Sequence, residues 1–323
     1  MTDETDRRAR RRPLPDRWSR GRGAAVTRLA GGVVVPQGTG SFRLAPTSRV
    51  FCLGSAFART LEAALGRSGA RLASLPDGRR DTARDRAARL LDLDDPVSVR
   101  QCLDWAAGAP FPEEALLPEG DLWRDPFLPS GAEPLPLDGV RARRAGIAAQ
   151  TARLFNADLA LLVLGQAETW FDRRTRLALT GPPPRHAREA DPGRFGVKRL
   201  SYDEAAVALK AACALIRRRR PEGKIVLAVS PLPLERTFTG DDIIVANMAG
   251  KSVLHAAATA MAARNEGVDY FPAYEAATAS DPGHAWESDR RTLRPALVGR
   301  LADSFMRDYG LTLAPDSGTA GTA

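Results

Sequence analysis

Four apolar runs, separated by longer amphipathic segments, constrain the fold of this chain more than any other feature of its sequence. They cover residues 49–53, 158–164, 224–229 and 268–271. Strands that are apolar along their whole length are buried on both faces, which is typical of a parallel sheet with helices on each side. The sequence therefore predicts an α/β fold, namely a three-layer α/β/α sandwich around a parallel central sheet.

Amphipathic periodicity predicts the helices that accompany these strands. The expected helices cover 57–65, 95–107, 140–156, 202–219, 242–265 and 294–309, and a further short strand is expected at 70–75. The pair Asp95-Pro96 is typical of a helix start, since aspartate caps the first turn and proline fits into it. Two stretches interrupt the pattern: residues 110–136, rich in proline, are expected to form an ordered surface excursion or a flap, and residues 171–200 to be irregular.

A single domain accounts for most of the chain. The sequence has 323 residues, of which 44% are hydrophobic and 27% are charged, a composition typical of globular proteins. We expect one domain over residues 31–310, a disordered basic arm over 1–30 and a flexible tail over 311–323. The sequence has neither an apolar run long enough to span a membrane nor an apolar signal core, so we expect a cytoplasmic protein.

Charge and cysteine content exclude several classes of partner. The net charge of +8 comes mainly from arginine, and part of it lies in the arm and in residues 217–220, at the end of a predicted helix. Recognition of nucleic acid would need aromatic residues among these arginines or a groove-reading helix, and neither is present. Cys52, Cys102 and Cys213 lie in apolar segments without metal-ligand spacing, as small buried side chains do. We therefore expect no metal, no cofactor and no nucleic-acid partner.

A serine lies where the first predicted strand turns abruptly into a helix. The apolar run that begins at Val50 ends at the pair Gly54-Ser55. This position puts the Ser55 hydroxyl at a helix N-terminus, where free N–H groups favour developing negative charge. Ser55 is thus a candidate nucleophile whose own N–H is an expected oxyanion donor. The alternative is a serine that only caps the helix.

Five sequence blocks, in order, resemble those of the GSCFA family. The first is Gly54-Ser55-Ala56-Phe57-Ala58, in which Ala56 stands in place of the signature cysteine. The others are residues 164–170 (LGQAETW), residues 230–234 (SPLPL), Asn247 with Lys251-Ser252, and residues 270–275 (YFPAYE). Five blocks in order are more specific than any single motif. The family is similar to the SGNH/GDSL hydrolases, so the resemblance implies a serine nucleophile just after the first strand and a late Asp-x-x-His pair.

The resemblance implies that a histidine activates Ser55. The string Asp281-Pro282-Gly283-His284 lies between the last predicted strand and the last helix, where that superfamily keeps its pair. His284, assisted by Asp281, is therefore the expected base. Lining up the last helix instead puts Asp289 and Thr292 at the equivalent places, which leaves His284 as an exposed loop histidine.

Further candidates follow the other predicted strands, because the sites of parallel sheets form at the carboxyl ends of their strands. Glu168 is expected to bind ligand or position the base, or else to pair with Lys251 or an arginine. The resemblance implies a Gly-x-Asn oxyanion donor, but the segment here reads Gly165-Gln166-Ala167-Glu168, so Gln166 or Asn247 is expected to substitute. Trp170 is expected to wall a sugar or acyl pocket, or to be a core aromatic. The expected oxyanion or substrate-binding residues are Gly54, Gly165, Gln166, Glu168, Trp170, Asn247, Lys251, Tyr274 and Glu275.

These observations predict functions from different classes. The first is a serine-dependent esterase or O-acyltransferase that forms an acyl-Ser55 intermediate from an acylated carbohydrate or another small ester. The second is a non-catalytic relative that binds a carbohydrate or a partner protein in the same cleft. A third expectation is a polyanion-binding protein that uses the arginine arm.

Overall fold

A five-stranded parallel sheet forms the centre of the molecule. The computed structural model describes residues 18–19, 24–36, 40–74 and 91–311. The strands lie in the order β10-β9-β5-β1-β2, and every neighbouring pair runs parallel. Their bounds are β1 Arg49–Gly54, β2 Arg71–Leu72, β5 Leu159–Leu164, β9 Lys224–Val229 and β10 Val268–Phe271. The predicted α/β class with a parallel central sheet is confirmed.

Side chains of the central strands alternate between two separate hydrophobic cores. Along β5, Leu161 and Val163 belong to one core, whereas Ala160 and Leu162 belong to the other. All six residues of β5 are buried, because helices cover the sheet on both faces. This explains why the strands have continuous apolar sequences rather than alternating ones.

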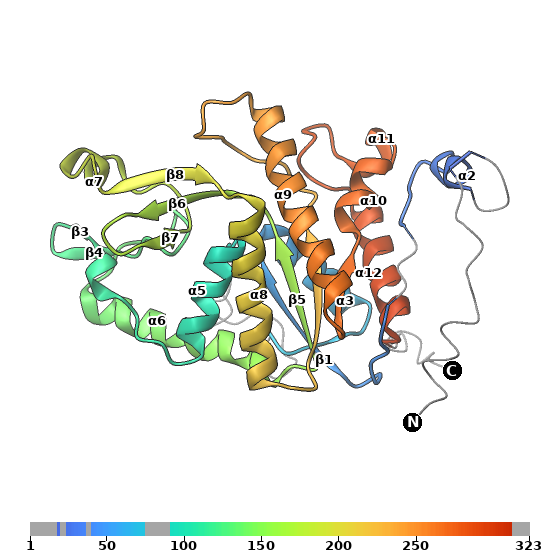
Figure 1. Cartoon of the computed structure of the whole chain (residues 1–323), viewed down its shortest axis with the longest axis horizontal. Coiled ribbons are helices and arrows are strands. Elements are labelled where there is room, and N and C mark those ends of the chain that lie inside the picture. Colours follow the sequence, from blue (N-terminus) through green and yellow to red (C-terminus); the bar gives the residue numbers. More distant parts are fainter. Residues whose placement is uncertain (1–17, 20–23, 37–39, 75–90, 312–323) are drawn as a thin grey trace, which may run out of the picture.

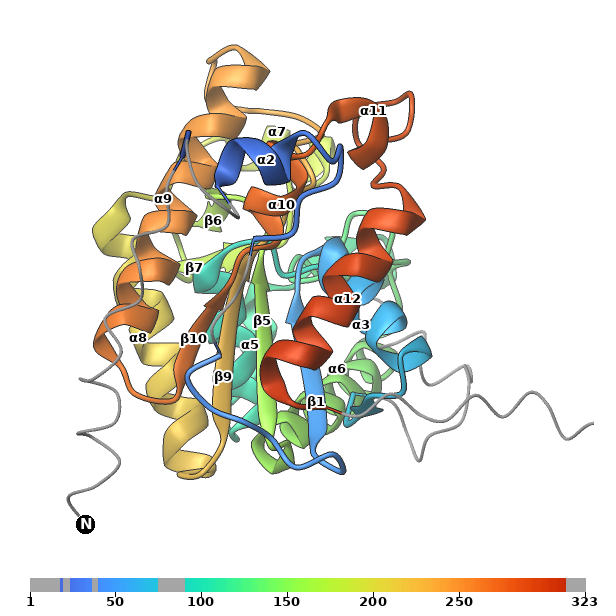
Figure 2. The same cartoon turned by 90° about the vertical axis from the view of Figure 1, so that its right-hand side faces the viewer.

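Two groups of helices cover the two faces (Figures 1 and 2). One face packs against α5 (Pro96–Ala106), α6 (Leu137–Ala152), α8 (Tyr202–Arg219) and α9 (Ile243–Arg264). The opposite face packs against α3 (Ala56–Arg67), α10 (Ala273–Ala279) and α12 (Pro295–Tyr309). The predicted helices match these bounds closely where capping is clear. Asp95 accepts hydrogen bonds from the N–H groups of Val97 and Ser98, and Ser201 with Glu204 forms a capping box at the start of α8.

The segment 171–200 is not irregular, and the prediction for it was wrong. Together with residues 168–170 it forms a three-stranded antiparallel sheet in the order β7-β6-β8, which extends from the end of β5 (Figure 1). Its elements are β6 Glu168–Asp172, β7 Leu177–Leu179, α7 Arg185–Ala190 and β8 Phe195–Arg199. Asp172 pairs with Leu177 on one side and Phe195 on the other. These short strands depend on partners elsewhere in the chain, which local periodicity cannot reveal.

The segment 110–136 is an ordered excursion. It contains a single turn of 3₁₀ helix, η1 (Glu113–Ala115), and an antiparallel pair of short strands, β3 (Leu117–Glu119) and β4 (Leu122–Arg124). A second 3₁₀ turn, η2 (Arg153–Asn156), continues α6 toward β5.

Most of the predicted basic arm and tail lies outside the described residues. The arm was predicted to extend too far, because Ala25–Leu29 form a short helix, α2, and Ala24 is buried. Another short helix, α11 (Pro282–Ala285), precedes α12. Within the described ranges, no helix combines the length and the apolar character that crossing a membrane requires.

The turn after β1 requires a glycine. Gly54 has φ of +135°, and a Cβ at this position would overlap the carbonyl oxygen of Val163 on β5. Glycine has no Cβ and adopts this positive φ freely, so the chain can pass close to β5 and turn directly from the end of β1 into the start of α3. As a result, Ser55 lies at the carboxyl edge of the sheet.

Candidate active site

A pocket of about 280 Å³ opens beyond the carboxyl ends of β1, β5 and β9. Ser55, Gly165 and Ser230 directly follow these three strands, and all three line the pocket. The strand register pairs Gly54 with Val163 and Leu164 with Val229, so the three strand ends lie side by side. The pocket therefore forms where parallel α/β sheets bind their ligands.

The Ser55 hydroxyl is available for chemistry. Ser55 is the N-cap residue of α3, yet its side chain accepts no capping hydrogen bond. Its Oγ is buried and has no hydrogen-bond partner among the described residues. A buried hydroxyl without a partner is costly in a folded protein, so its position is better explained by a ligand than by capping.

The N–H of Ser55 is not free, contrary to the sequence-based expectation that it donates to an oxyanion. It donates to the carbonyl oxygen of Val163 at 2.9 Å and extends the pairing of β1 with β5. Ala56 also lines the pocket and is the first residue of α3. First-turn N–H groups have no partner within their own helix, so the Ala56 N–H is the better-placed donor.

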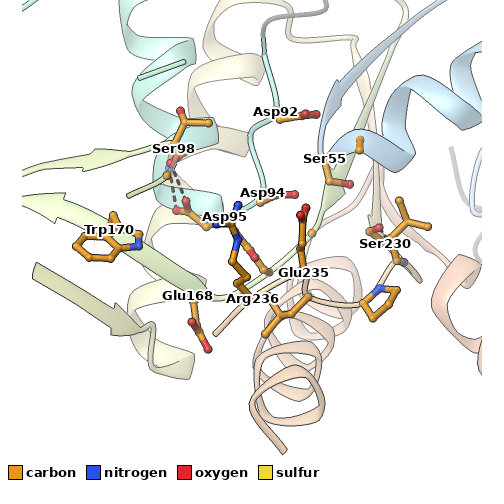
Figure 3. A pocket seen from close by; sticks show the side chains of 18 of the residues that line it. Ser55, Asp92, Asp94, Asp95, Ser98, Glu168, Trp170, Ser230, Glu235 and Arg236 are labelled. Carbon is orange, nitrogen blue, oxygen red and sulfur yellow. Dashed lines mark hydrogen bonds between the residues drawn. The ribbon is translucent and has the colours of Figure 1, made fainter. Parts of the chain in front are cut away.

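Asp94 lies beside Ser55. The N–H groups of Gly165 and Gln166 donate to the Asp94 carbonyl oxygen at 2.6 and 3.1 Å. A Cβ built on Gly165 would overlap Asp94 Oδ1 and come within 2.8 Å of Ser55 Cβ. Both side chains therefore border the same methyl-sized space above Gly165, and in Figure 3 the Asp94 carboxyl points toward Ser55.

The Asp94 carboxyl has an unusually high affinity for its proton. Burial, together with the nearby carboxylates of Asp92 and Asp95, raises its pKa to about 7, while Lys251 and Arg59 oppose the shift. A carboxyl group of this kind exchanges its proton near neutral pH, as general acids and bases in enzymes do.

Lys251 holds the strand ends together beneath the pocket. Its ammonium group is buried and donates to the carbonyl oxygens of Gly165 and Ser230, the latter at 2.7 Å. Burial lowers its pKa to about 8, and Asp94 limits the shift. Lys251 is not among the residues that line the pocket, so the structure places it as a support rather than in contact with a ligand.

We expect Lys251→Met to destabilise the protein by about 2 kcal/mol, because two buried carbonyl oxygens lose their donor. Urea denaturation at pH 7 measures the change. Lys210→Met is the matched control, since Lys210 is an exposed lysine on α8. Equal denaturation midpoints for both variants would contradict the supporting role.

Glu168 anchors a loop over the pocket. Its carboxylate accepts hydrogen bonds from Thr237 Oγ1 at 2.6 Å and from the N–H of Phe238 at 3.0 Å. These partners differ from the alternative of a pairing with Lys251 or an arginine, and Lys251 donates instead to the carbonyl oxygens of Gly165 and Ser230. Phe238 in turn makes an edge contact with Trp170, with ring centroids 5.2 Å apart. Glu168, Trp170 and Phe238 all line the pocket and form one of its walls.

Charged side chains surround the rest of the pocket. Arg59 and Asp92 form a two-bonded ion pair at one side, with Nη2–Oδ2 at 3.1 Å. Arg291 lies 3.6 Å from Glu235 at another side, and Arg236 follows Glu235 in the lining. Within the described ranges, no three His, Cys, Asp or Glu side chains are grouped so that they could hold a metal ion.

His284 does not lie in this pocket. Its imidazole packs against Gly32, and its Nδ1 lies 3.1 Å from Asp281 Oδ1. The two side chains are 66% and 55% exposed, and none of the described lining residues is a histidine. Asp281 and His284 thus form a surface pair. Asp289 and Thr292 bond to each other, and their neighbour Arg291 is the residue of this loop that lines the pocket.

Gly54, which forms the turn after β1, and three other predicted residues lie outside the pocket lining. Asn247 Oδ1 accepts from the N–H of Leu234 and so holds the loop after β9. Glu275 accepts from Tyr270 at 2.9 Å and lies 2.8 Å from His255 Nε2, forming a separate cluster. The Tyr274 hydroxyl faces the sulfur of Met248.

The structure adds pocket residues that sequence reasoning missed. The most important are Asp92 and Asp94, in the acidic run Asp92-Leu93-Asp94-Asp95 before α5. Only Asp95 was recognised there, as a helix cap. The remaining additions are Ser98, residues 179–182, residues 232–236, Phe238 and Arg291. The sequence signal that could have indicated them is the unusual density of acidic residues just before a helix.

Comparisons with known proteins add a family and a distant structural likeness. The GSCFA family model matches residues 49–305. No curated protein matches the sequence of this chain. Among solved structures, the chain is similar to one titled "Salicylyl-Acyltransferase SsfX3 from a Tetracycline Biosynthetic Pathway", with 15% identity and a TM-score of 0.33. That match covers 82% of this chain, which spans 55% of the other chain's length.

Proposed function

The chain belongs to the GSCFA family, and on this premise we propose that it is a serine-dependent esterase or O-acyltransferase. Ser55 is the proposed nucleophile, and an acyl-Ser55 ester is the intermediate. The observation that carries the proposal is the buried Ser55 hydroxyl, which has no partner among the described residues and faces the pocket at the start of α3. A buried serine hydroxyl with only a structural role would be expected to have a hydrogen-bond partner in the protein.

The proposed reaction has two halves. Ser55 Oγ attacks the ester carbonyl, loses its proton to a base, and forms a tetrahedral intermediate whose oxyanion accepts from the Ala56 N–H. Collapse of this intermediate expels the alcohol, which takes the proton back. Water or an acceptor hydroxyl then attacks the carbonyl of acyl-Ser55 and gives its proton to the base. Ser55 Oγ leaves and takes that proton back, which releases an acid when water attacks or a new ester when a hydroxyl attacks.

An acylated carbohydrate is the proposed substrate class. The pocket combines an aromatic wall, Trp170 with Phe238, and several charged or polar groups, among them Asp92 and Arg236. Sugars are bound by such mixed surfaces, since their hydroxyls need hydrogen-bond partners and their ring faces stack on aromatic side chains. A relation to the SGNH/GDSL hydrolases is part of the proposal, supported by a serine directly after the first strand of a parallel sheet.

A non-catalytic binding function is the second candidate. It is favoured by one observation, namely that the described lining of the pocket contains no histidine to activate Ser55. In that case the same pocket would bind a carbohydrate or a partner without turning it over.

Labelling with a fluorophosphonate distinguishes the two candidates. We expect the wild-type protein to be labelled, mass spectrometry to locate the adduct on Ser55, and Ser55→Ala to abolish it. Ser252→Ala is the control, because Ser252 is exposed on α9 and donates to the Met248 carbonyl. A folded wild-type protein that takes up no label would overturn the serine mechanism and favour the binding function.

A further inference from the structure

We propose that Asp94 is the base that removes the proton from Ser55, in the place that a histidine takes in most serine hydrolases. This inference rests on the proposed function, and it assigns the one role that the pocket leaves open. Asp94 lines the pocket together with Ser55.

The geometry places the two groups within reach of each other. Asp94 Oδ1 and Ser55 Cβ lie on the same side of Gly165, where only the absence of a side chain leaves room for both. The Asp94 main chain is fixed there by the N–H groups of Gly165 and Gln166. The Ser55 hydroxyl has no partner among the described residues, so nothing holds it from rotating about the Cα–Cβ bond toward the carboxyl group. Catalytic hydrogen bonds often form only when a substrate is bound, so a hydroxyl without a partner suits this role.

The predicted base, His284, lacks this geometry. It is a largely exposed residue on α11 that contacts Gly32 and is held by Asp281. Other acids that line the pocket have partners of their own, among them Glu235, which lies 3.6 Å from Arg291. Asp95 accepts three hydrogen bonds, from Ser98 Oγ and from two N–H groups, and caps α5. Asp92 is paired with Arg59.

The charged groups around Asp94 suit it to accept a proton near neutral pH. Asp92 and Asp95 face it from its own loop, Lys251 from α9 and Arg59 from α3. Burial and the two carboxylates together outweigh the two cations, and the pKa of Asp94 is about 7. A base must be ionised to act, so the rate of Ser55 reaction is expected to rise with pH through about 7 and then level off.

The proton balance is simple. As the bond from Ser55 Oγ to the acyl carbon forms, the hydroxyl proton moves to Asp94. When the bond to the leaving alcohol breaks, Asp94 returns that proton to the alcohol oxygen. In the second half, the attacking water or hydroxyl gives a proton to Asp94, which then passes it to Ser55 Oγ. Asp94 ends ionised, as it began.

Asp94→Asn is the direct test, measured as the second-order rate of fluorophosphonate labelling between pH 5 and 9. We expect a loss of about a thousand-fold, because general bases contribute roughly 10²–10⁴. His284→Ala is expected to keep the wild-type rate and the inflection near pH 7. The assignment of Asp94 is overturned if the labelling rate of Asp94→Asn is within a few fold of the wild-type rate, or if His284→Ala loses labelling instead.

Asp92→Asn tests the assignment without touching the base. Asp92 raises the pKa of Asp94, and its loss also frees Arg59, which lowers it. The inflection of the labelling rate is therefore expected to move to lower pH. An unchanged inflection in a folded Asp92→Asn protein overturns the assignment of Asp94, even if Asp94→Asn fails to fold. If wild-type Ser55 is labelled but one of these two variants gives the contradicting result, Asp94 is not the base, while the proposed function still holds.

Discussion

Replacing Gly165 with alanine is expected to lower the labelling rate of Ser55 at least about a hundred-fold. The new methyl group would fill the space that Asp94 Oδ1 occupies and come within 2.8 Å of Ser55 Cβ. The two side chains would have to move apart, and misplacing a reacting pair by about 1 Å can cost about a hundred-fold in rate. Labelling kinetics at pH 8 measure the effect, and circular dichroism checks that the fold is kept.

Gly146→Ala is the matched control for this substitution. Gly146 lies in the interior of α6, and a Cβ there would meet no atom within 4 Å. Alanine is the better helix former, so this variant is expected to keep wild-type labelling and to gain slightly in stability. If Gly165→Ala labelled as fast as Gly146→Ala, Ser55 and Asp94 would not form the reacting pair inferred here.

Replacing Asp125 with alanine is expected to reduce the free energy of unfolding by about 3–5 kcal/mol, since it leaves a buried cation without its partner. Arg144 donates to both carboxylate oxygens of Asp125, and the two side chains are 7% and 0% exposed. The guanidinium group also lies over the ring of Phe111, 4.7 Å from its centroid. These contacts tie α6 to the excursion formed by residues 110–136, and denaturation in urea measures their loss.

An exposed ion pair provides the comparison for Asp125. Glu189 and Arg185 pair at 2.6 Å on α7, but their side chains are 60% and 85% exposed. Surface pairs contribute little, so Glu189→Ala is expected to leave the denaturation midpoint nearly unchanged. A similarly small effect of Asp125→Ala would show that water reaches Arg144 in the native state.

Local sequence signals were sufficient to predict the bounds of several helices and strands of the core. The structure places β9 at Lys224–Val229 and α8 at Tyr202–Arg219, with the predicted bounds, because a continuous apolar run marks the strand and amphipathic periodicity marks the helix. Helix α5 starts at its predicted cap, Asp95. The same local reasoning placed Ser55 at the strand-to-helix turn, since glycine followed by serine after an apolar run has few other uses.

The chemistry around Ser55 depends on pairings that no local pattern contains. Glu168 and Trp170 were expected beside the site, and both line the pocket, because they follow a central strand. Their partners, Thr237 and Phe238, come from a distant loop, and the role of Glu168 follows from them. His284 was chosen because it stands three residues after Asp281. In the structure it packs against Gly32, and the Asp-x-x-His spacing contains no information about where that N-terminal segment lies.

The sequence by itself determined the parallel α/β architecture and the place of Ser55 at the end of the first strand, since burial periodicity, caps and turn residues act over a few neighbouring positions. Only the tertiary structure decided which acid lies beside that serine. Asp94 reaches it because β1 and β5 pair in one register and because Gly165 leaves a methyl-sized space at their ends. Contacts of that kind depend on the packing of segments far apart in the chain, and packing is a property of the whole fold.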